Sequence, residues 1–264
     1  MTVSLWRFVG KPLVRFGNGV SYRLSLLAAA FAFWGLYYGQ LALVFLRTLR
    51  PTPSSLVDAI RLVRLIRMVL PYSSLLPPRL AALHRLSREI DKRSVPGDVV
   101  ECGVYNGGSA AVMASVCTRS PLNRRIWLFD SFEGLPRPTR NDGDGAQDYT
   151  SWCHGDVAKV KTILQEFSIP ESRLSIVKGW FQDTFPAVQI PAIALLHIDA
   201  DWYESVKLCL EKFYDSVQPG GFIVIDDYGH WEGARKATDE FLRARAPEVK
   251  LTRVDYTGRY FRKP

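Results

Sequence analysis

Acidic residues close two neighbouring apolar segments in the second half of the chain. Asp199 and Asp201 follow one segment, and Asp226 and Asp227 follow the next. Four carboxylates gathered at one place repel one another. A divalent cation that prefers oxygen ligands is the simplest way to balance their charge. We therefore expect Mg²⁺ or a similar ion here, although any single Asp could instead serve the local structure.

A glycine turn precedes these acids, in the stretch 97–109. This stretch reads as a short apolar strand, a turn that contains Gly103 and Gly107, and the start of a helix. Glycine lets a ligand approach the backbone and reach the free N–H groups of the helix. The spacing E-x-G-x-x-x-G-G differs from the G-x-G-x-x-G of nicotinamide enzymes. Glu101, near the strand end, suits a cationic ligand such as a sulfonium with an α-amino group.

A third candidate is Asp130, which ends the next apolar run, Trp127-Leu128-Phe129-Asp130-Ser131. An acid that ends a strand beside a glycine turn can accept hydrogen bonds from two ribose hydroxyls. The alternative is an Asp that caps a helix or a turn. We interpret Asp130 as a ribose-binding residue.

The elements that must position these residues alternate between strand and helix from residue 98 onward. This alternation predicts a parallel sheet with helices on both faces, whose ligands bind at the carboxyl ends of the strands. A helix over 78–93 is the first to pack on the sheet. The predicted strands are 98–102, 126–130, 174–178, 193–199 and 221–226, followed by a hairpin of 249–255 and 259–263 that inserts an antiparallel strand.

The N-terminal third is basic and apolar. Residues 1–95 hold 14 Lys and Arg against 3 Asp and Glu, whereas residues 96–264 hold 20 against 23. Residues 24–46 carry no formal charge, and roughly 20 apolar residues can span a bilayer. We predict a membrane anchor there. The alternative is a hydrophobic helix buried in the domain or in a dimer interface. In the latter case the protein would be a homo-oligomer.

A second N-terminal helix is predicted over 56–70, between proline-containing segments. Arg61, Arg64 and Arg67 recur in it at a spacing of three. Such a basic amphipathic stripe can lie on anionic lipid, or the helix can pack on the domain with a solvated basic face. We divide the chain into a basic segment (1–23), the anchor (24–46), a basic helix and proline linker (47–77) and an α/β domain (78–264).

Two classes of partner are not expected. Nothing in the chain resembles a nucleic-acid-binding motif. The four cysteines (Cys102, Cys117, Cys153 and Cys209) contain no C-x-x-C pair, so neither a zinc site nor a disulfide framework is predicted, and a reducing compartment fits.

Five motifs together resemble the macrocin/mycinamicin sugar O-methyltransferase family. They are PGDVVECGVYNGGS, DSFEGLP, KGWFQDTFP, HIDADWYES and PGGFIVIDDYGHWEGARKATDEF, and the resemblance runs from about 72 to 264. It implies an O-methyltransferase that depends on S-adenosylmethionine (SAM) and Mg²⁺. It also implies a class I, Rossmann-like fold with a seven-stranded, mostly parallel sheet and an antiparallel C-terminal hairpin strand.

The resemblance also implies residue roles. The cofactor-binding residues would be Glu101, Gly103 and Gly107 at the methionine end of SAM, Asp130 with Ser131 at the ribose, and Gly179, Trp180 and Phe181 at the adenine. The metal ligands would be Asp199, Asp226 and Asp227. Trp180 and Phe181 could instead be core residues. Asp201 either faces the cofactor or caps the helix that begins at Trp202.

A metal bound to the acceptor hydroxyl stabilises the alkoxide and orients it, and deprotonation needs a base. Asp199 is the first candidate base, and His230 and His154 are the others. His197 alternates into a strand and is expected to be buried. The long polar loop 137–156 is predicted to be a lid over the substrate.

The function predicted from these residues is methyl transfer to a hydroxyl of a sugar or sugar-containing acceptor, such as a lipid-linked glycan or a glycolipid. The enzyme would be membrane-associated with its catalytic domain in the cytoplasm, where SAM is made. One alternative acceptor is a non-sugar diol of secondary metabolism. Another alternative is a membrane-tethered SAM-binding protein without catalysis.

Overall fold

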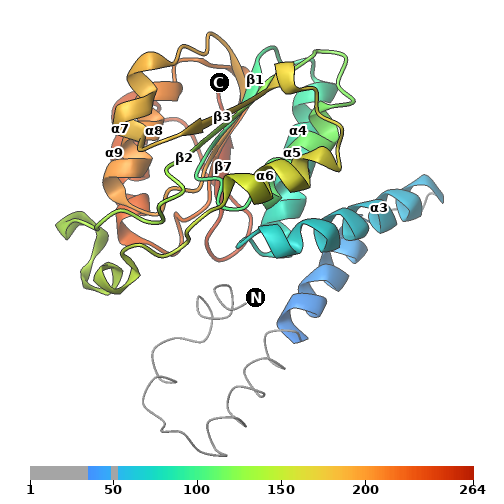
Figure 1. Ribbon diagram of the computed structural model, residues 1–264, viewed down its shortest axis with the longest axis horizontal. Helices are drawn as coiled ribbons and strands as arrows, with labels where there is room; N and C mark the ends of the chain where they lie inside the picture. Colours follow the sequence, from blue (N-terminus) through green and yellow to red (C-terminus); the bar gives the residue numbers. More distant parts are fainter. Residues whose placement is uncertain (1–34, 49–52) are drawn as a thin grey trace, which may run out of the picture.

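The computed structural model describes residues 35–48 and 53–264, and its centre is a seven-stranded sheet (Figure 1). The strand order is β3-β2-β1-β4-β5-β7-β6. The first five are mutually parallel, and β7 runs antiparallel to both β5 and β6. The strands are β1 (Asp98–Cys102), β2 (Ile126–Asp130), β3 (Leu174–Lys178), β4 (Ile193–Ile198), β5 (Val217–Ile225), β6 (Thr252–Arg253) and β7 (Arg259–Arg262).

Helices cover both faces of the sheet, and the alternating strand residues bury into two separate hydrophobic clusters (Figure 1). In β1, Val99 belongs to the cluster under α4 and α5, whereas Val100 belongs to the cluster under α8 and α9. One face carries α4 (Pro77–Lys92), α5 (Gly108–Cys117) and α6 (Val157–Gln165). The other carries α7 (Phe181–Thr184), α8 (Tyr203–Phe213) and α9 (Glu232–Arg245). The predicted fold class is therefore confirmed, including the inserted antiparallel strand.

The structure differs from the predicted boundaries in three places. β5 begins at Val217, four residues early, because the strand continues past a register shift opposite Ile193 of β4. β6 has only two residues, since its ladder with β7 is limited to two pairs. The helix predicted over 78–93 begins one residue early, at Pro77: Pro77 and Pro78 form the first turn of α4, where a missing N–H costs nothing.

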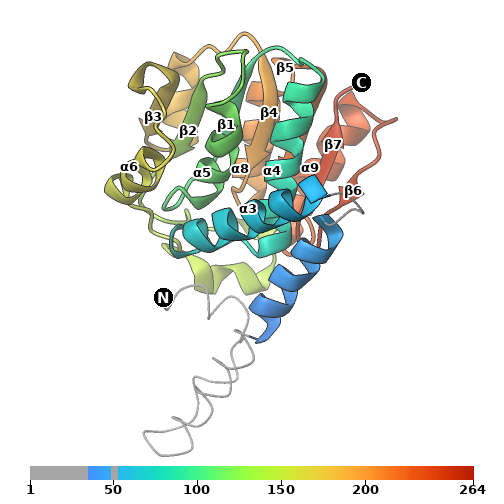
Figure 2. The ribbon, with the colours of Figure 1, turned by 90° about the vertical axis from the view of Figure 1, so that its right-hand side faces the viewer.

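The N-terminal helices pack on the α4–α5 face (Figure 2). A helix over 35–48 and α3 (Pro53–Val69) bury side chains in the same hydrophobic cluster as α4 and α5. The predicted anchor 24–46 lies partly outside the described residues, which omit 24–34. Among the residues that are described, no helix combines the length and the apolarity that a bilayer span needs.

Candidate active site

A cavity of about 530 Å³ opens at the carboxyl ends of the parallel strands, as predicted. Each of four strands contributes a wall residue from its end or from the turn after it: Gly103, Asp130, Gly179 and Asp199. The size is in the usual range for a site that holds a small organic molecule. Trp180 and Phe181 also line it, so the ring positions expected for adenine are present. Phe181 stacks on Phe185 as well, with ring centroids 4.9 Å apart, and so packs in the core at the same time.

The turn after β1 requires glycine at two positions. Gly103 has φ +88°, and a Cβ added there would lie 1.8 Å from the carbonyl oxygen of Asp199. The backbones after β1 and β4 therefore touch directly, which brings Asp199 against the turn. Gly107, the N-cap of α5, is left-handed with φ +89° and ψ +11°. At both positions protein atoms occupy the space of a side chain, since a Cβ at Gly107 would lie 3.1 Å from Val160 Cα. The two glycines are therefore needed for close packing of the turn, and access of a ligand to its backbone stays a prediction.

A Gly103→Ala substitution is expected to destabilise the protein by at least about 2 kcal/mol, because a positive φ and a steric overlap both oppose the new methyl group. The change would be measured as the free energy of unfolding in denaturant. Gly145→Ala is the matched control, since a Cβ at Gly145 meets nothing within 4 Å. Equal stability of the two variants would contradict the close approach described here.

Asp130 holds the glycine turn in place. Its Oδ2 accepts hydrogen bonds from the backbone N–H groups of Val104 (2.7 Å) and Tyr105 (2.8 Å), and its Oδ1 accepts one from Phe132 (2.6 Å). Burial raises the pKa of the Asp130 carboxyl, and the three backbone donors oppose that rise. The carboxylate also lines the cavity. Asp130 therefore orders the turn as well as facing the site, a second role that the sequence did not indicate.

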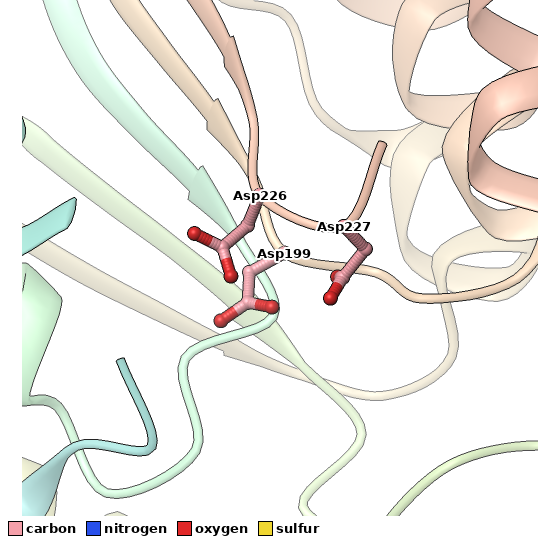
Figure 3. Close-up of side chains that lie close together, drawn as sticks. All are labelled: Asp199, Asp226 and Asp227. Atoms are coloured by element: carbon pink, nitrogen blue, oxygen red, sulfur yellow. The ribbon is translucent and has the colours of Figure 1, made fainter. Parts of the chain in front are cut away.

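The carboxylates of Asp199, Asp226 and Asp227 converge at the ends of β4 and β5 (Figure 3). One oxygen from each lies within 4.8 Å of the others. Asp226 and Asp227 are buried, whereas Asp199 is half-buried and lines the cavity. Three hard oxygen donors at this separation fit a divalent cation such as Mg²⁺. The three residues proposed as metal ligands are thus brought together, beside the cavity.

The charge of this cluster is partly balanced by the protein itself. Arg79 of α4, which is 6% exposed, forms an ion pair with Asp226, and its Nε lies 3.3 Å from Asp255 Oδ2. Burial alone would lower the pKa of the Arg79 guanidinium, but these carboxylates raise it, so the group stays charged. Part of the charge that the sequence analysis assigned to a cation is therefore balanced by the protein itself. The case for a metal rests instead on the geometry of the oxygens.

His197 is fully buried, as predicted, but it is a polar link rather than a simple core residue. Its Nδ1 lies 2.8 Å from Glu101 Oε1, and its Nε2 lies 3.9 Å from Asp226 Oδ1. Burial lowers the pKa of His197, yet the carboxylates of Asp226 and Glu101 outweigh this and raise it to about 10. His197 therefore lies between the two acids and joins the carboxylate cluster at the strand ends to Glu101 of β1.

The start of α8 is capped by a residue from a distant loop, Asp142. The first N–H of the helix, at Tyr203, donates to Asp142 Oδ1 at 2.6 Å. Asp201 has φ +55°, lines the cavity, and accepts a hydrogen bond from the indole Nε1 of Trp231 at 2.8 Å. Its placement in the wall agrees with the cofactor-facing alternative.

The loop 137–156 is docked against α8 and α9 rather than extended into solvent. It contains two short 3-10 helices, η3 (Arg140–Asp142) and η4 (Asp144–Tyr149). Asp142, 2% exposed, caps α8 and also accepts hydrogen bonds from the N–H (2.7 Å) and the hydroxyl (3.0 Å) of Thr139. Thr139 and Asp142 line the cavity. The loop forms one wall of the site, and its movement as a lid stays a prediction.

Replacing Asp142 by Ala is expected to release this loop, because the change removes the α8 cap and both contacts to Thr139. Loss of such a cap costs about 1 kcal/mol. Limited proteolysis should then cleave within 137–156 faster than in the wild type. Asp144→Ala, in an exposed position of the same loop, is the control and should leave the cleavage rate unchanged. Equal rates for the two variants would contradict the anchoring role.

Several predicted site residues lie away from the cavity. His230 and His154 are exposed, and neither is among the described residues that line it. Glu101, fully buried and bonded to His197, is not in the wall either, nor is Gly107. Ser131 is in the wall. Asp199 is therefore the candidate base that the structure places best, and a direct contact of Glu101 with a cofactor stays a prediction.

The sequence analysis missed three residues of the site: Arg79, Asp142 and Trp231. Arg79 comes from a helix that ends before β1, and nothing in its local sequence points to an acid 147 positions away. Asp142 had a weak signal, since a Thr139-x-x-Asp142 pattern is typical of a capping box. Trp231 lies in a quoted motif without an assigned role.

Comparisons with known proteins agree with this geometry. A family model described as macrocin-O-methyltransferase (TylF) matches residues 69–263. The 8-demethyl-8-(2,3-dimethoxy-α-L-rhamnosyl)-tetracenomycin-C 4'-O-methyltransferase of Streptomyces olivaceus is 30% identical over 174 residues, which are 64% of this chain and 66% of the relative. The mycinamicin III 3''-O-methyltransferase of Micromonospora griseorubida is 29% identical over 64% of this chain and 69% of the relative. The chain therefore spans about two thirds of the length of these two relatives.

Solved structures of methyltransferases are also similar to this chain. The structure of the O-methyltransferase NovP superposes with a TM-score of 0.67 at 26% identity, over 73% of this chain and 82% of that one. The calicheamicin methyltransferase CalS11 superposes with a TM-score of 0.59 at 21% identity, which bears on the fold alone.

Proposed function

Because the chain belongs to the macrocin O-methyltransferase family, we infer that it transfers a methyl group from SAM to a hydroxyl of a sugar or sugar-containing acceptor with the help of Mg²⁺. One observation carries this proposal. Asp199 lines the cavity and at the same time places an oxygen within 4.8 Å of the oxygens of Asp226 and Asp227. A cofactor in the cavity and an ion on the carboxylates would thus meet at one residue.

The cavity offers the groups that SAM requires. Gly103 lines the cavity, so the methionine part could lie against its backbone. Asp130 keeps lone pairs for ribose hydroxyls, and Trp180 and Phe181 offer aromatic rings for the adenine. When bound, SAM supplies an electrophilic methyl group on a sulfonium. The acceptor oxygen would form the new C–O bond as the S–CH₃ bond breaks, and Asp199 would take the proton of the hydroxyl.

The carboxylate cluster fits Mg²⁺ by the chemistry of its donors, and Asp199, Asp226 and Asp227 would hold it. When bound, such an ion lowers the pKa of a coordinated hydroxyl and orients it. Arg79 fixes the carboxylate of Asp226 through their ion pair, which leaves less freedom for that ligand. Asp199 is our proposed base, since among the three acids it is the one that lines the cavity.

A narrower proposal concerns where the acceptor is. The apolar stretch 24–46 and the arginines of α3 suggest that the enzyme works at the cytoplasmic surface of a membrane. A lipid-linked saccharide or a glycolipid would then be a suitable acceptor. The proposal is supported by sequence composition and stands apart from the methyl-transfer chemistry.

The test of the proposed function is an acceptor screen with SAM labelled in its methyl group. The full-length protein would be assayed with Mg²⁺ against water-soluble glycosides, lipid-linked glycosides and catechols. Transfer to glycosides supports the proposal, and a preference for lipid-linked ones supports the narrower form. Transfer to catechols alone would favour a non-sugar diol as acceptor. SAM binding without transfer to any class would favour a binding protein without catalysis.

A further inference from the structure

Helix α3 is apolar on both of its faces. Its inner face buries Ala59, Leu62, Ile66 and Val69. Its outward face exposes seven residues that follow one another along a single helical stripe: Leu56, Val57, Ile60, Arg61, Arg64, Arg67 and Met68. The four apolar members are between 37% and 47% exposed. The outward stripe thus mixes exposed apolar side chains with three arginines, and packing within the domain does not explain why those apolar side chains are exposed.

The helix over 35–48 repeats this arrangement beside α3 (Figure 2). Tyr37, Leu41 and Val44 are buried, whereas the other side exposes Leu36 (62%), Tyr38 (53%), Leu43 (51%) and Leu46 (61%). Within the described part of the chain, eight of the ten exposed large apolar side chains lie on these two helices. We call the outward residues of both helices the N-terminal face. Such a concentration marks an interaction surface.

The charge of the N-terminal face is positive. Arg47, Arg61, Arg64 and Arg67 lie among its apolar residues. Asp58, the acid of α3, lies at the side of the stripe, 3.6 Å from Arg88 of α4. Next to the face is a groove of about 1550 Å³. Its described lining includes Lys92 and seven arginines (Arg47, Arg61, Arg64, Arg85, Arg88, Arg119 and Arg253) against three acids (Asp58, Glu89 and Asp91), so it is positive on balance. A partner of this surface must therefore be apolar and anionic at once.

We propose that the N-terminal face docks on an anionic lipid bilayer, with its apolar side chains at the headgroup–acyl boundary and its arginines on lipid phosphates. Apolar residues mixed with arginines on one helix surface are what such a boundary binds. A second copy of the chain fits less well. In a two-fold symmetric dimer the same face meets itself, so the arginines around the symmetry axis would repel one another.

The N-terminal face is connected to the candidate active site by a short segment of the chain. Docking therefore bears on the acceptor, and this step rests on the proposed function. The chain continues from α3 through η2 (Leu70–Tyr72) to Ser74, which lines the cavity of the candidate active site. Docking would therefore hold that site beside the membrane, where an acceptor carried on a lipid is found. The docking itself is measured without any methyl-transfer assay, so either idea can fail alone.

The experiment is flotation of the full-length protein with vesicles of phosphatidylcholine, alone or mixed with phosphatidylglycerol in equal parts. The wild type should prefer the anionic vesicles, and added salt should weaken the preference. Arg61→Gln/Arg64→Gln/Arg67→Gln should weaken binding to anionic vesicles on the order of 100-fold, since each basic residue near the surface contributes about fivefold. Leu56→Gln/Ile60→Gln should weaken binding without a change in charge.

The matched control removes three cations from the opposite side of the sheet, Lys212→Gln/Arg243→Gln/Arg245→Gln on α8 and α9, and should bind as the wild type does. Thermal melting confirms that each variant folds. If both α3 variants bind anionic vesicles as the wild type does, any contact with lipid is made by other residues, and the proposal is overturned. A second outcome would also overturn the proposal. If the wild type does not bind vesicles but sediments as a dimer, and Leu56→Gln/Ile60→Gln dissociates that dimer, the N-terminal face is a protein interface.

Discussion

Replacing Asp199 by Asn is expected to lower the rate of methyl transfer about 1,000-fold or more. The change removes the proposed base, which alone contributes about 100- to 10,000-fold, and it removes one oxygen of the proposed metal site. Asn keeps the shape of the side chain, and the contact with Gly103 involves the carbonyl group and Cβ of Asp199, which Asn retains. The affinity for SAM should therefore change little.

Single-turnover transfer of a labelled methyl group, with an acceptor from the screen, measures this rate. His230→Asn and His154→Gln are the controls, because both histidines are exposed and neither is among the described cavity-lining residues. Each should retain the rate of the wild type. If either histidine variant lost activity while Asp199→Asn kept it, the assignment of the base would be wrong.

Replacing Asp130 by Ala is expected to raise the dissociation constant of SAM about 100-fold. Two hydrogen bonds from ribose hydroxyls to a carboxylate contribute together roughly 3 kcal/mol, which corresponds to about this factor. The N–H groups of Val104 and Tyr105 would also lose their acceptor, so the glycine turn should be less ordered. Calorimetric titration of SAM into the full-length protein measures the affinity without an acceptor.

Asp130→Asn separates these two effects, since it keeps one oxygen acceptor in the same place. It should weaken SAM binding less than Asp130→Ala does, and thermal melting should show which loss comes from the fold. Wild-type affinity in Asp130→Ala would contradict the ribose role. Suppose that Asp130→Ala lowers the melting temperature while Asp130→Asn binds SAM as tightly as the wild type does. Asp130 would then have only a structural role, that of holding the glycine turn.

The sheet and the edge that carries the site could be predicted because both depend on local sequence pattern. Buried parallel strands such as β4 read as short apolar runs, and the polar residues that follow them must meet at the carboxyl ends. The convergence of Asp199 with Asp226 and Asp227 follows from the pairing of β4 with β5. Strand alternation likewise placed His197 inside the protein.

Contacts between distant segments could not be read from the sequence in this way. The ion pair of Arg79 with Asp226 depends on how α4 lies across the sheet, which no periodicity specifies. Asp142 caps α8 across 61 positions, so the local sequence near Tyr203 offered only the nearby Asp201 as an alternative cap. The stripe of arginines on α3 could be read from the sequence, whereas the exposure of Leu56, Ile60 and Met68 beside it needed the structure.

The most direct test of the account is whether methyl transfer needs a metal held by the carboxylate cluster. The full-length enzyme would be treated with EDTA, dialysed, and assayed for methyl transfer before and after addition of Mg²⁺, together with Asp226→Ala. We predict that chelation abolishes transfer by the wild type, that Mg²⁺ restores it, and that Asp226→Ala stays inactive while it still binds SAM. Full transfer by the chelated enzyme, with no metal detected by mass spectrometry, would contradict the account.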